Sequence, residues 1–148
     1  MMATTLTKLM VHITLSTKSR RPMIAPEIES DLYAYIGGIC RKKSSVLLAM
    51  GGTSDHVHLF VNLSKTVAVA ELLLEVKRES SRWMHRTDRK FDWQDGYFAF
   101  TLGESGSKAL HRYIASQKKH HAEMDFKDEV RALCRKYGVE LDERYAWD

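Results

Sequence analysis

Cysteine and proline are scarce in this chain of 148 residues. The two cysteines, Cys40 and Cys134, lie far apart and form no Cys-x-x-Cys pattern, which argues against a disulfide framework and against a cysteine zinc site. The two prolines, Pro22 and Pro26, share one early stretch. Because no repeat, low-complexity segment or linker interrupts the chain, we expect a single domain over residues 1–148.

Long apolar runs are also absent from the sequence. None approaches the roughly 18–20 residues that cross a bilayer, so we expect no membrane-spanning helix. Residues 1–8 lack a basic segment followed by a long apolar core, which predicts no secretory signal and a cytoplasmic location. We expect no nucleotide cofactor either.

Basic residues are in modest excess. Lys and Arg number 23 against 19 Asp and Glu, which gives a net charge of +4 and permits nucleic-acid binding without requiring it. The placement of these residues is more informative than their number. Candidates for contacts with a DNA backbone lie after the first predicted strand and on the second predicted helix: Lys18, Arg20, Lys77, Arg78 and Arg82. For the helical residues, a solvated helix face is the competing interpretation.

Hydrophobic periodicity predicts strands that alternate with helices. Apolar and β-branched runs predict strands at residues 9–16, 45–50, 56–63 and 97–102. Helical spacing predicts helices at residues 26–43, 66–85, 107–121 and 127–137. Thr66 is the expected N-cap of the second helix, Ser105 or Ser107 that of the third, and Gly138 the end of the last.

The order of these elements predicts the fold class. It reads β-α-β-β-α-β and then continues with helices, which is the ferredoxin-like split βαβ arrangement. We therefore expect an α+β fold, with an antiparallel sheet, helices on one face and additional C-terminal helices. The opposite face of the sheet has to be covered by the C-terminal helices, by a second subunit or by nucleic acid.

Two histidines, His56 and His58, flank Val57 in the third predicted strand. Side chains alternate along a strand, so both imidazoles point to the same face, with their Cα atoms ~6–7 Å apart. Two imidazoles at that separation can bind one divalent metal ion. A surface pair or a hydrogen-bonded pair in the core is the competing interpretation.

Tyr113 and Gln117 are four residues apart, which places them on one face of the third predicted helix. A tyrosine can act as a nucleophile in phosphoryl transfer, and a glutamine oxygen can be a third metal ligand. The competing interpretation makes Tyr113 an ordinary residue at the edge of the core.

Other polar residues lie close in sequence to these candidates. Asp55 can orient a histidine ligand, but we expect it to serve the turn before the strand. His120 and His121 are expected at a solvated helix end, although His121 lies four residues after Gln117 and can approach the site. His12 is expected to be structural.

Residues 54–60, Ser-Asp-His-Val-His-Leu-Phe, resemble the histidine–hydrophobic–histidine motif of the HUH nucleases. Residues 113–121, Tyr-Ile-Ala-Ser-Gln-Lys-Lys-His-His, resemble the tyrosine-bearing helix of the single-tyrosine transposases, which move bacterial insertion sequences or accompany repeated extragenic palindromes. Further stretches fit the same family, and with them the resemblance covers nearly the whole chain: residues 17–20, 77–83, 93–100 and 140–145. Ser54 stands where many members have proline, which should alter only the turn.

The resemblance implies a transposase that cleaves and rejoins single-stranded DNA at hairpin-marked element ends. It implies Tyr113 as the nucleophile, with a 5′-phosphotyrosine intermediate and a free 3′-OH. It implies His56, His58 and Gln117 as ligands of Mg²⁺ or Mn²⁺, a set that leaves positions open for a phosphate oxygen and water. It also implies a homodimer, in which the tyrosine helix can serve its own subunit or the partner.

Three other functions remain open at this point. The chain can be a domesticated relative that nicks palindromic repeats without moving its own gene. It can be a nucleic-acid-binding module without catalysis, which suits the sheet topology but leaves the histidine and Tyr113–Gln117 pairs unexplained. It can also be a plain metal-binding regulator.

Overall fold

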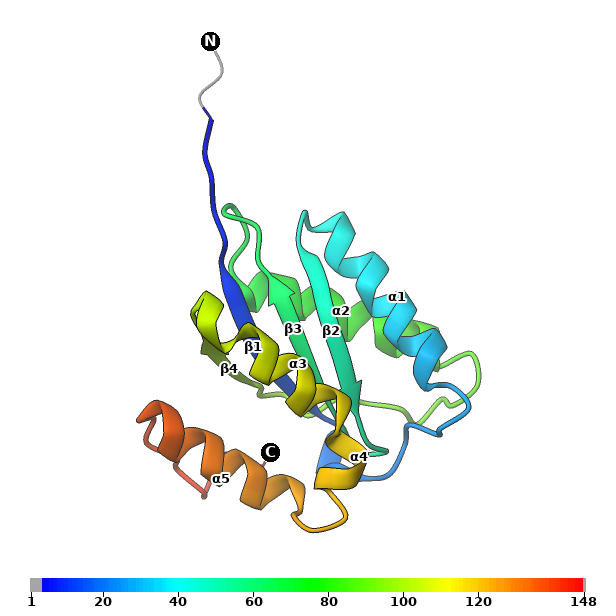
Figure 1. Cartoon of the computed structure of the whole chain (residues 1–148). Helices are drawn as coiled ribbons and strands as arrows, with labels where there is room; N and C mark the ends of the chain where they lie inside the picture. The colour runs from blue at the N-terminus through cyan, green and yellow to red at the C-terminus, as the bar shows by residue number, and fades with distance from the viewer. Residues whose placement is uncertain (1–3, 148) are drawn as a thin grey trace.

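A four-stranded antiparallel sheet with strand order β2-β3-β1-β4 lies at the centre of this computed structural model, which describes residues 4–147 (Figure 1). Its strands are β1 (Met10–Ser16), β2 (Val46–Gly52), β3 (His56–Asn62) and β4 (Phe98–Thr101). Part of the segment expected to lack a secretory signal, residues 1–3, lies outside the described residues. The predicted antiparallel α+β fold is confirmed.

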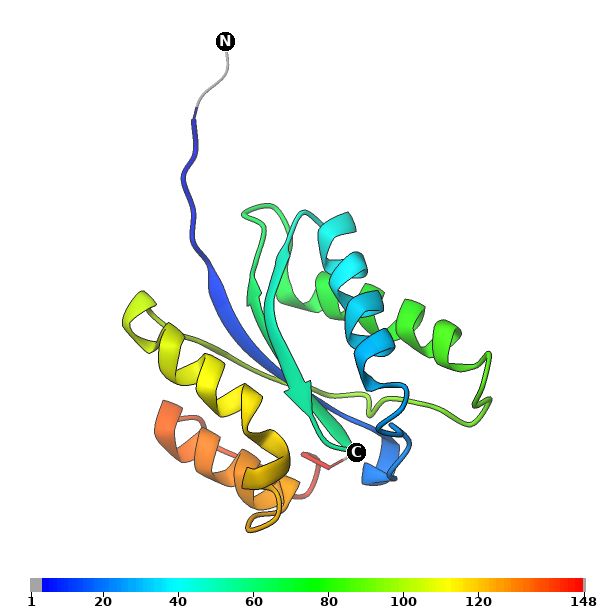
Figure 2. The same ribbon diagram turned by 45° about the vertical axis from the view of Figure 1, so that its right-hand side comes forward.

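Helices cover both faces of this sheet (Figures 1 and 2). One layer consists of α1 (Glu29–Lys42) and α2 (Val69–Met84), which are the two helices of the split βαβ unit. The other face carries α3 (Ser107–Ala115), α4 (Gln117–His120) and α5 (Phe126–Tyr137). The sequence left open whether the second face is covered by the C-terminal helices, by a second subunit or by nucleic acid. In the structure, the C-terminal helices cover it.

The pleat of β3 sorts its side chains between these two layers. Alternate residues join the main core with α1 and α2, namely Val57, Leu59 and Val61. The residues between them face α3 and α5, namely His56, His58 and Phe60. The candidate metal ligands therefore lie on the sheet face that the C-terminal helices cover.

α3 approaches β2 closely, and a glycine makes this approach possible. A Cβ atom on Gly51 would lie 2.5 Å from the carbonyl oxygen of Ile114, which is closer than carbon and oxygen can pack. Ile114 and Leu110 pack on Phe60 from this position. The glycine thus sets the height of the helix that carries Tyr113 above the sheet.

The helix predicted over residues 107–121 is interrupted. α3 ends at Ala115, Ser116 has φ −100° and ψ 16°, and α4 starts at Gln117. The Ser116 hydroxyl donates to the carbonyl oxygen of Tyr113, a local bond that competes with helix continuation. The prediction of one continuous helix was therefore wrong at this residue.

The predicted side-chain caps of α2 and α3 were also wrong. α2 starts at Val69 after Ala68, and Thr66 lies in the turn before it, where its backbone N–H donates to the Ser64 hydroxyl. α3 follows a 3₁₀ turn over Glu104–Gly106 and has no side-chain cap. Smaller shifts at the other helix and strand ends amount to one to three residues.

α5 ends where its sequence predicts and starts one residue earlier than expected, at Phe126. The Asp125 side chain caps it by accepting from the backbone N–H of Asp128 at 2.8 Å. Gly138, with φ 68°, ends it in the left-handed conformation that glycine tolerates. The apolar side of α5 packs on Phe100 of β4.

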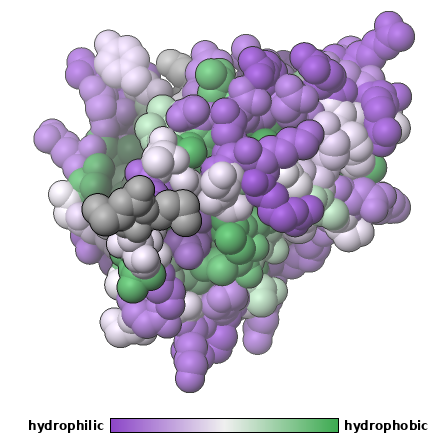
Figure 3. Space-filling model, turned by 90° about the horizontal axis from the view of Figure 1, so that it is seen from above, coloured by the Kyte–Doolittle hydropathy of each residue, from purple (hydrophilic) through white to green (hydrophobic). Residues whose placement is uncertain are grey.

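The outer surface is largely polar. Hydrophilic residues cover most of the face in Figure 3, with apolar residues visible between them. Among residues 4–147, no helix is both long and apolar enough to cross a membrane.

Candidate metal and nucleophile site

His56 and His58 are fully buried, with their ring centroids 5.2 Å apart. Both project from β3 toward the C-terminal helices, as the period of two along a strand predicts. Their burial rules out the surface-pair interpretation. It leaves either a metal site or a hydrogen-bonded core, and the neighbouring side chains distinguish the two.

Gln117 and Tyr113 reach the same place from α4 and α3. The Gln117 Oε1 atom lies 3.0 Å from His56 Nε2, and the Gln117 amide donates to Glu129 Oε2 at 3.1 Å. The Tyr113 hydroxyl also donates to Glu129 Oε2. All four residues predicted for the site therefore meet within one chain, despite the break at Ser116.

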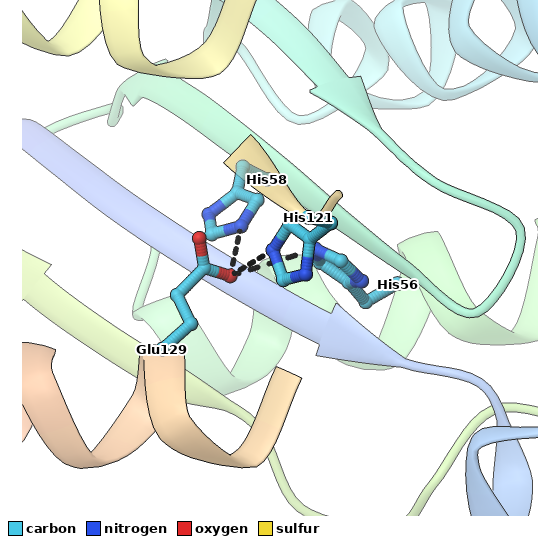
Figure 4. A group of neighbouring side chains, drawn as sticks. All are labelled: His56, His58, His121 and Glu129. Carbon is cyan, nitrogen blue, oxygen red and sulfur yellow. Dashed lines mark hydrogen bonds and ion pairs between the residues drawn. The ribbon is translucent and has the colours of Figure 1, made fainter. Parts of the chain in front are cut away.

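Two further residues complete this cluster, and sequence reasoning did not assign either of them to it. Glu129 of α5 is 1% exposed, and His121 follows α4 with a side chain that is 9% exposed. In Figure 4 the rings of His56, His58 and His121 lie beside the Glu129 carboxylate, and dashed lines join all three to it. The Nε2 atoms of the three rings lie 3.5, 2.9 and 3.0 Å from Glu129 Oε1, in that order.

One signal in the sequence pointed to Glu129. It occupies the apolar stripe of α5, three residues after Phe126 and four before Leu133, both of which are buried. A carboxylate on such a stripe needs a partner, because an unpaired buried charge is strongly unfavourable. For His121, the expected solvated helix end was wrong, because the chain turns after α4 and brings its ring against His56, with centroids 4.2 Å apart.

Asp55 and His12 orient His56 and His58 through hydrogen bonds at their Nδ1 atoms. The His56 Nδ1–H donates to Asp55 Oδ1 at 2.7 Å, so Asp55 does more than serve the turn. His12 Nε2 and His58 Nδ1 share a hydrogen bond of 2.8 Å, and the Thr14 hydroxyl lies 3.2 Å from the same nitrogen. Such contacts fix the tautomer and the direction of a ligating imidazole.

The electrostatics favour neutral rings at His58 and His12 and an ionised carboxylate at Glu129. Burial lowers the pKa of His58, and burial together with the charge of His58 lowers the pKa of His12 to about 3. Burial alone would raise the pKa of Glu129, but close contacts with His121, His58 and Tyr113 hold it well below its usual value. Neutral imidazole and ionised carboxylate are the forms that bind metal.

The Tyr113 phenol is held in its protonated form. Burial raises the pKa of Tyr113 above its ordinary value, and the adjacent Glu129 carboxylate raises it further. The Tyr113 ring also meets the His58 ring edge to face, with centroids 5.5 Å apart. The nucleophile candidate is therefore oriented, and it needs a base before it can attack.

The donor set fits a divalent metal ion. The His56 Nδ1–H is given to Asp55, so its Nε2 atom is the one that faces Gln117 Oε1. Two acceptors at that distance need a cation, either a proton or a metal ion. One ligand atom from each of four residues lies within 4.8 Å of the others, namely from His56, His58, His121 and Glu129.

The five basic residues proposed to contact DNA are already engaged with protein groups. Lys77 donates to the carbonyl oxygens of Gln94 and Asp95, at 2.7 and 2.5 Å. The remaining contacts are Lys18 with Asp92, Arg20 with the Trp147 carbonyl, Arg78 with Glu75 and Arg82 with Glu79. Lys77, Arg78 and Arg82 lie on α2, across the sheet from the histidines, so their contact with DNA stays a prediction.

Comparison with known proteins gives a family match. The family model described as IS200-like transposase matches residues 5–117. The transposases of insertion sequence element IS200 from Salmonella typhimurium and Salmonella typhi are each 25% identical over 122 residues, which cover 77% of this chain and 77% of each relative.

Solved structures give a likeness of fold. A protein from Deinococcus radiodurans R1, named as a transposase, superimposes with a TM-score of 0.63 and 21% identity, over 79% of this chain and 96% of that one. A REP-associated tyrosine transposase bound to a REP hairpin also gives a TM-score of 0.63, with 16% identity, over 84% of this chain and 76% of that one. His121 and Glu129 lie beyond the residues that the family model matches.

Proposed function

Because this chain belongs to the IS200-like transposase family, we propose that it cleaves and rejoins single-stranded DNA at hairpin-marked element ends through a covalent bond to Tyr113. The whole chain acts as one transposase domain, and its metal is Mg²⁺ or Mn²⁺. The observation that carries this proposal is the convergence of Tyr113, Gln117 and the two strand histidines around one buried carboxylate.

The reaction is a transesterification at phosphorus. The Tyr113 oxygen attacks a backbone phosphate, the bond from phosphorus to the 3′ oxygen of the upstream nucleotide breaks, and that oxygen leaves as a 3′-OH. The phenolic proton has a direct route to Glu129 Oε2, to which it is already hydrogen-bonded. Because the phosphotyrosine bond replaces one phosphodiester by another, a 3′-OH can reseal the strand without ATP.

Residues of three elements support this chemistry. His56, His58 and Gln117 would hold the metal ion, which supplies Lewis-acid polarisation of the phosphate and stabilises charge on the leaving oxygen. Asp55 and His12 keep the two imidazoles aimed at the site. The cover of α3 and α5 limits access of water to the covalent intermediate.

The DNA partner and the assembly are part of the same proposal. One similar structure is named as bound to a REP hairpin, and this supports a hairpin-bearing strand as the substrate. We propose a homodimer as well. Tyr113 lies beside its own chain's histidines, so each subunit has a complete set of candidate residues.

The alternative functions differ in what they leave unexplained. A nicking relative uses the same residues and differs only in whether its own gene moves. A binding module without catalysis, or a plain metal-binding regulator, gives no role to a tyrosine whose hydroxyl is directed at the carboxylate of the histidine cluster. This contact favours catalysis.

A covalent adduct is the decisive measurement. The protein is incubated with a hairpin-bearing oligonucleotide and Mn²⁺, and the products are separated on a denaturing gel. We expect an adduct that carries the 3′-labelled fragment and not the 5′-labelled one. Tyr113→Phe should abolish it, while Tyr145→Phe, at a residue 68% exposed, should not. If Tyr113→Phe forms the adduct in the same yield as the wild type, Tyr113 is not the nucleophile.

A further inference from the structure

Three imidazole nitrogens lie close to a single carboxylate oxygen in the centre of the site. His58 Nε2 and His121 Nε2 lie 2.9 and 3.0 Å from Glu129 Oε1, and His56 Nε2 lies 3.5 Å from it (Figure 4). These groups come from β3, from the turn after α4 and from α5. The side chains are almost completely buried, so bulk solvent has little access to them.

Hydrogen bonds alone do not account for this arrangement. The Nδ1–H of the His56 ring is already given to Asp55 at 2.7 Å, and its Nε2 faces two oxygens, Gln117 Oε1 at 3.0 Å and Glu129 Oε1 at 3.5 Å. Within residues 4–147, His121 Nε2 is buried and forms no hydrogen bond, although Glu129 Oε1 lies 3.0 Å from it. Buried nitrogen lone pairs that face a carboxylate are unfavourable unless a cation joins them.

The distances from Glu129 Oε1 to the three imidazole nitrogens match those between neighbouring ligands of one metal ion. Metal bonds to imidazole nitrogen and carboxylate oxygen are about 2.0–2.2 Å long. Neighbouring ligand atoms are then about 3.0 Å apart in an octahedron and about 3.4 Å apart in a tetrahedron. The observed separations from Glu129 Oε1, 2.9, 3.0 and 3.5 Å, have this size.

We infer that His121 and Glu129 are metal ligands together with His56 and His58, and that this three-imidazole, one-carboxylate site selects a transition metal ion such as Mn²⁺ over Mg²⁺. The inference deepens the proposed function and rests on it for the use of His56 and His58. It adds two ligands that lie beyond the residues matched by the family model.

The chemistry of the donors gives the selectivity. Mg²⁺ prefers oxygen ligands and gives up its water reluctantly, whereas imidazole suits the transition metals. With Gln117 Oε1 as a fifth donor, a six-coordinate ion keeps one open position for a phosphate oxygen. Two imidazoles and one amide alone would leave three positions open and discriminate less between the two metals.

Glu129 also connects this site to the nucleophile. Its Oε1 faces the histidines, while its Oε2 accepts from the Tyr113 hydroxyl and from the Gln117 amide. An ion bound at Oε1 therefore lies one carboxylate away from the attacking oxygen. The contact between Glu129 and His58 also connects α5 to β3, across 71 residues of sequence.

The test is metal binding itself, measured without DNA. Mn²⁺ is titrated into the full chain, and free ion is followed by its electron paramagnetic resonance signal. His121→Ala removes an imidazole ligand and Glu129→Gln removes the negative charge of the carboxylate, so each should weaken Mn²⁺ binding at least tenfold. A hundredfold excess of Mg²⁺ should leave most of the Mn²⁺ bound.

Matched controls come from neighbouring residues of the same type. His120→Ala changes the adjacent histidine, whose side chain is 33% exposed and whose Nε2 lies 3.6 Å from Glu129 Oε2. Glu123→Gln changes an exposed carboxylate between α4 and α5. Both controls should bind Mn²⁺ within threefold of the wild type.

A second measurement uses the wild type alone, so its result does not depend on whether a variant folds. Pulsed electron paramagnetic resonance on the Mn²⁺-bound wild type counts the coordinated imidazole nitrogens, and we expect three. A count of two, or unchanged affinity in His121→Ala, would overturn the added ligands while leaving the proposed function intact. Unchanged affinity in His56→Ala would instead remove the metal site of the proposed function.

Discussion

The hydroxyl of Tyr113 on α3 donates a hydrogen bond to the carboxylate of Glu129 on α5. These two residues are 16 positions apart, on helices that the turn after α4 folds back against each other. The contact joins the candidate nucleophile to the carboxylate that the histidines surround. Through this contact, α5 contributes a residue to the site as well as packing on the sheet.

The hydroxyl of Tyr113 should contribute to stability as well as to catalysis. Tyr113→Phe removes a hydrogen bond to a buried charged group, so we expect the free energy of unfolding to fall by about 1–2 kcal/mol. Urea unfolding followed by circular dichroism measures this change, with Tyr145→Phe as the control. A variant as stable as the wild type would mean that the Tyr113–Glu129 contact is not formed in solution.

Asp55 should control metal affinity through His56. Asp55→Asn replaces the charged acceptor of the His56 Nδ1–H by a neutral amide of the same size, which weakens the hold on the ring and its basicity. We expect Mn²⁺ affinity to fall about 10–100-fold. Titration calorimetry measures the affinity, and Asp31→Asn, an exposed position on α1, is the control. If Asp55→Asn and Asp31→Asn bind Mn²⁺ with equal affinity, Asp55 serves only the turn before β3.

Gly51 should be intolerant of any side chain, because α3 lies directly against it. Gly51→Ala places a methyl group 2.5 Å from the Ile114 carbonyl oxygen, so α3 and Tyr113 must shift. We expect a loss of about 1–3 kcal/mol in stability and reduced adduct formation by the folded protein. Gly103→Ala is the matched control, since its added methyl group meets nothing within 4 Å. If both variants behave alike, the close approach of α3 is not needed for the reaction.

Arg78 and Arg82 test whether α2 takes part in DNA binding. If each contacts one phosphate of a single strand, replacing it by alanine should reduce the slope of log K against log salt by about 0.7. Fluorescence anisotropy with a labelled hairpin oligonucleotide at several salt concentrations measures this slope, and Arg144→Ala serves for comparison. Unchanged slopes would assign both arginines to their ion pairs with Glu75 and Glu79.

Local geometry explains why four of the six residues of the site could be predicted. The period of two along a strand places His56 and His58 on one face wherever the strand lies in the fold. Tyr113 and Gln117 were matched through a helical spacing of four, and they still meet although Ser116 interrupts the helix. The remaining members, His121 and Glu129, depend on how the chain turns between α4 and α5, and no short-range periodicity encodes that turn.

The sequence by itself determined the β-α-β-β-α-β order, the antiparallel fold and the shared face of the two strand histidines, because alternation and helical spacing are properties of neighbouring residues. Only the tertiary structure decided what covers the second face of the sheet and which carboxylate the histidines meet. That choice depends on contacts such as His58 with Glu129, 71 residues apart, and on the room that Gly51 leaves for α3. Such contacts arise from packing between distant segments, which the local pattern of residues does not specify.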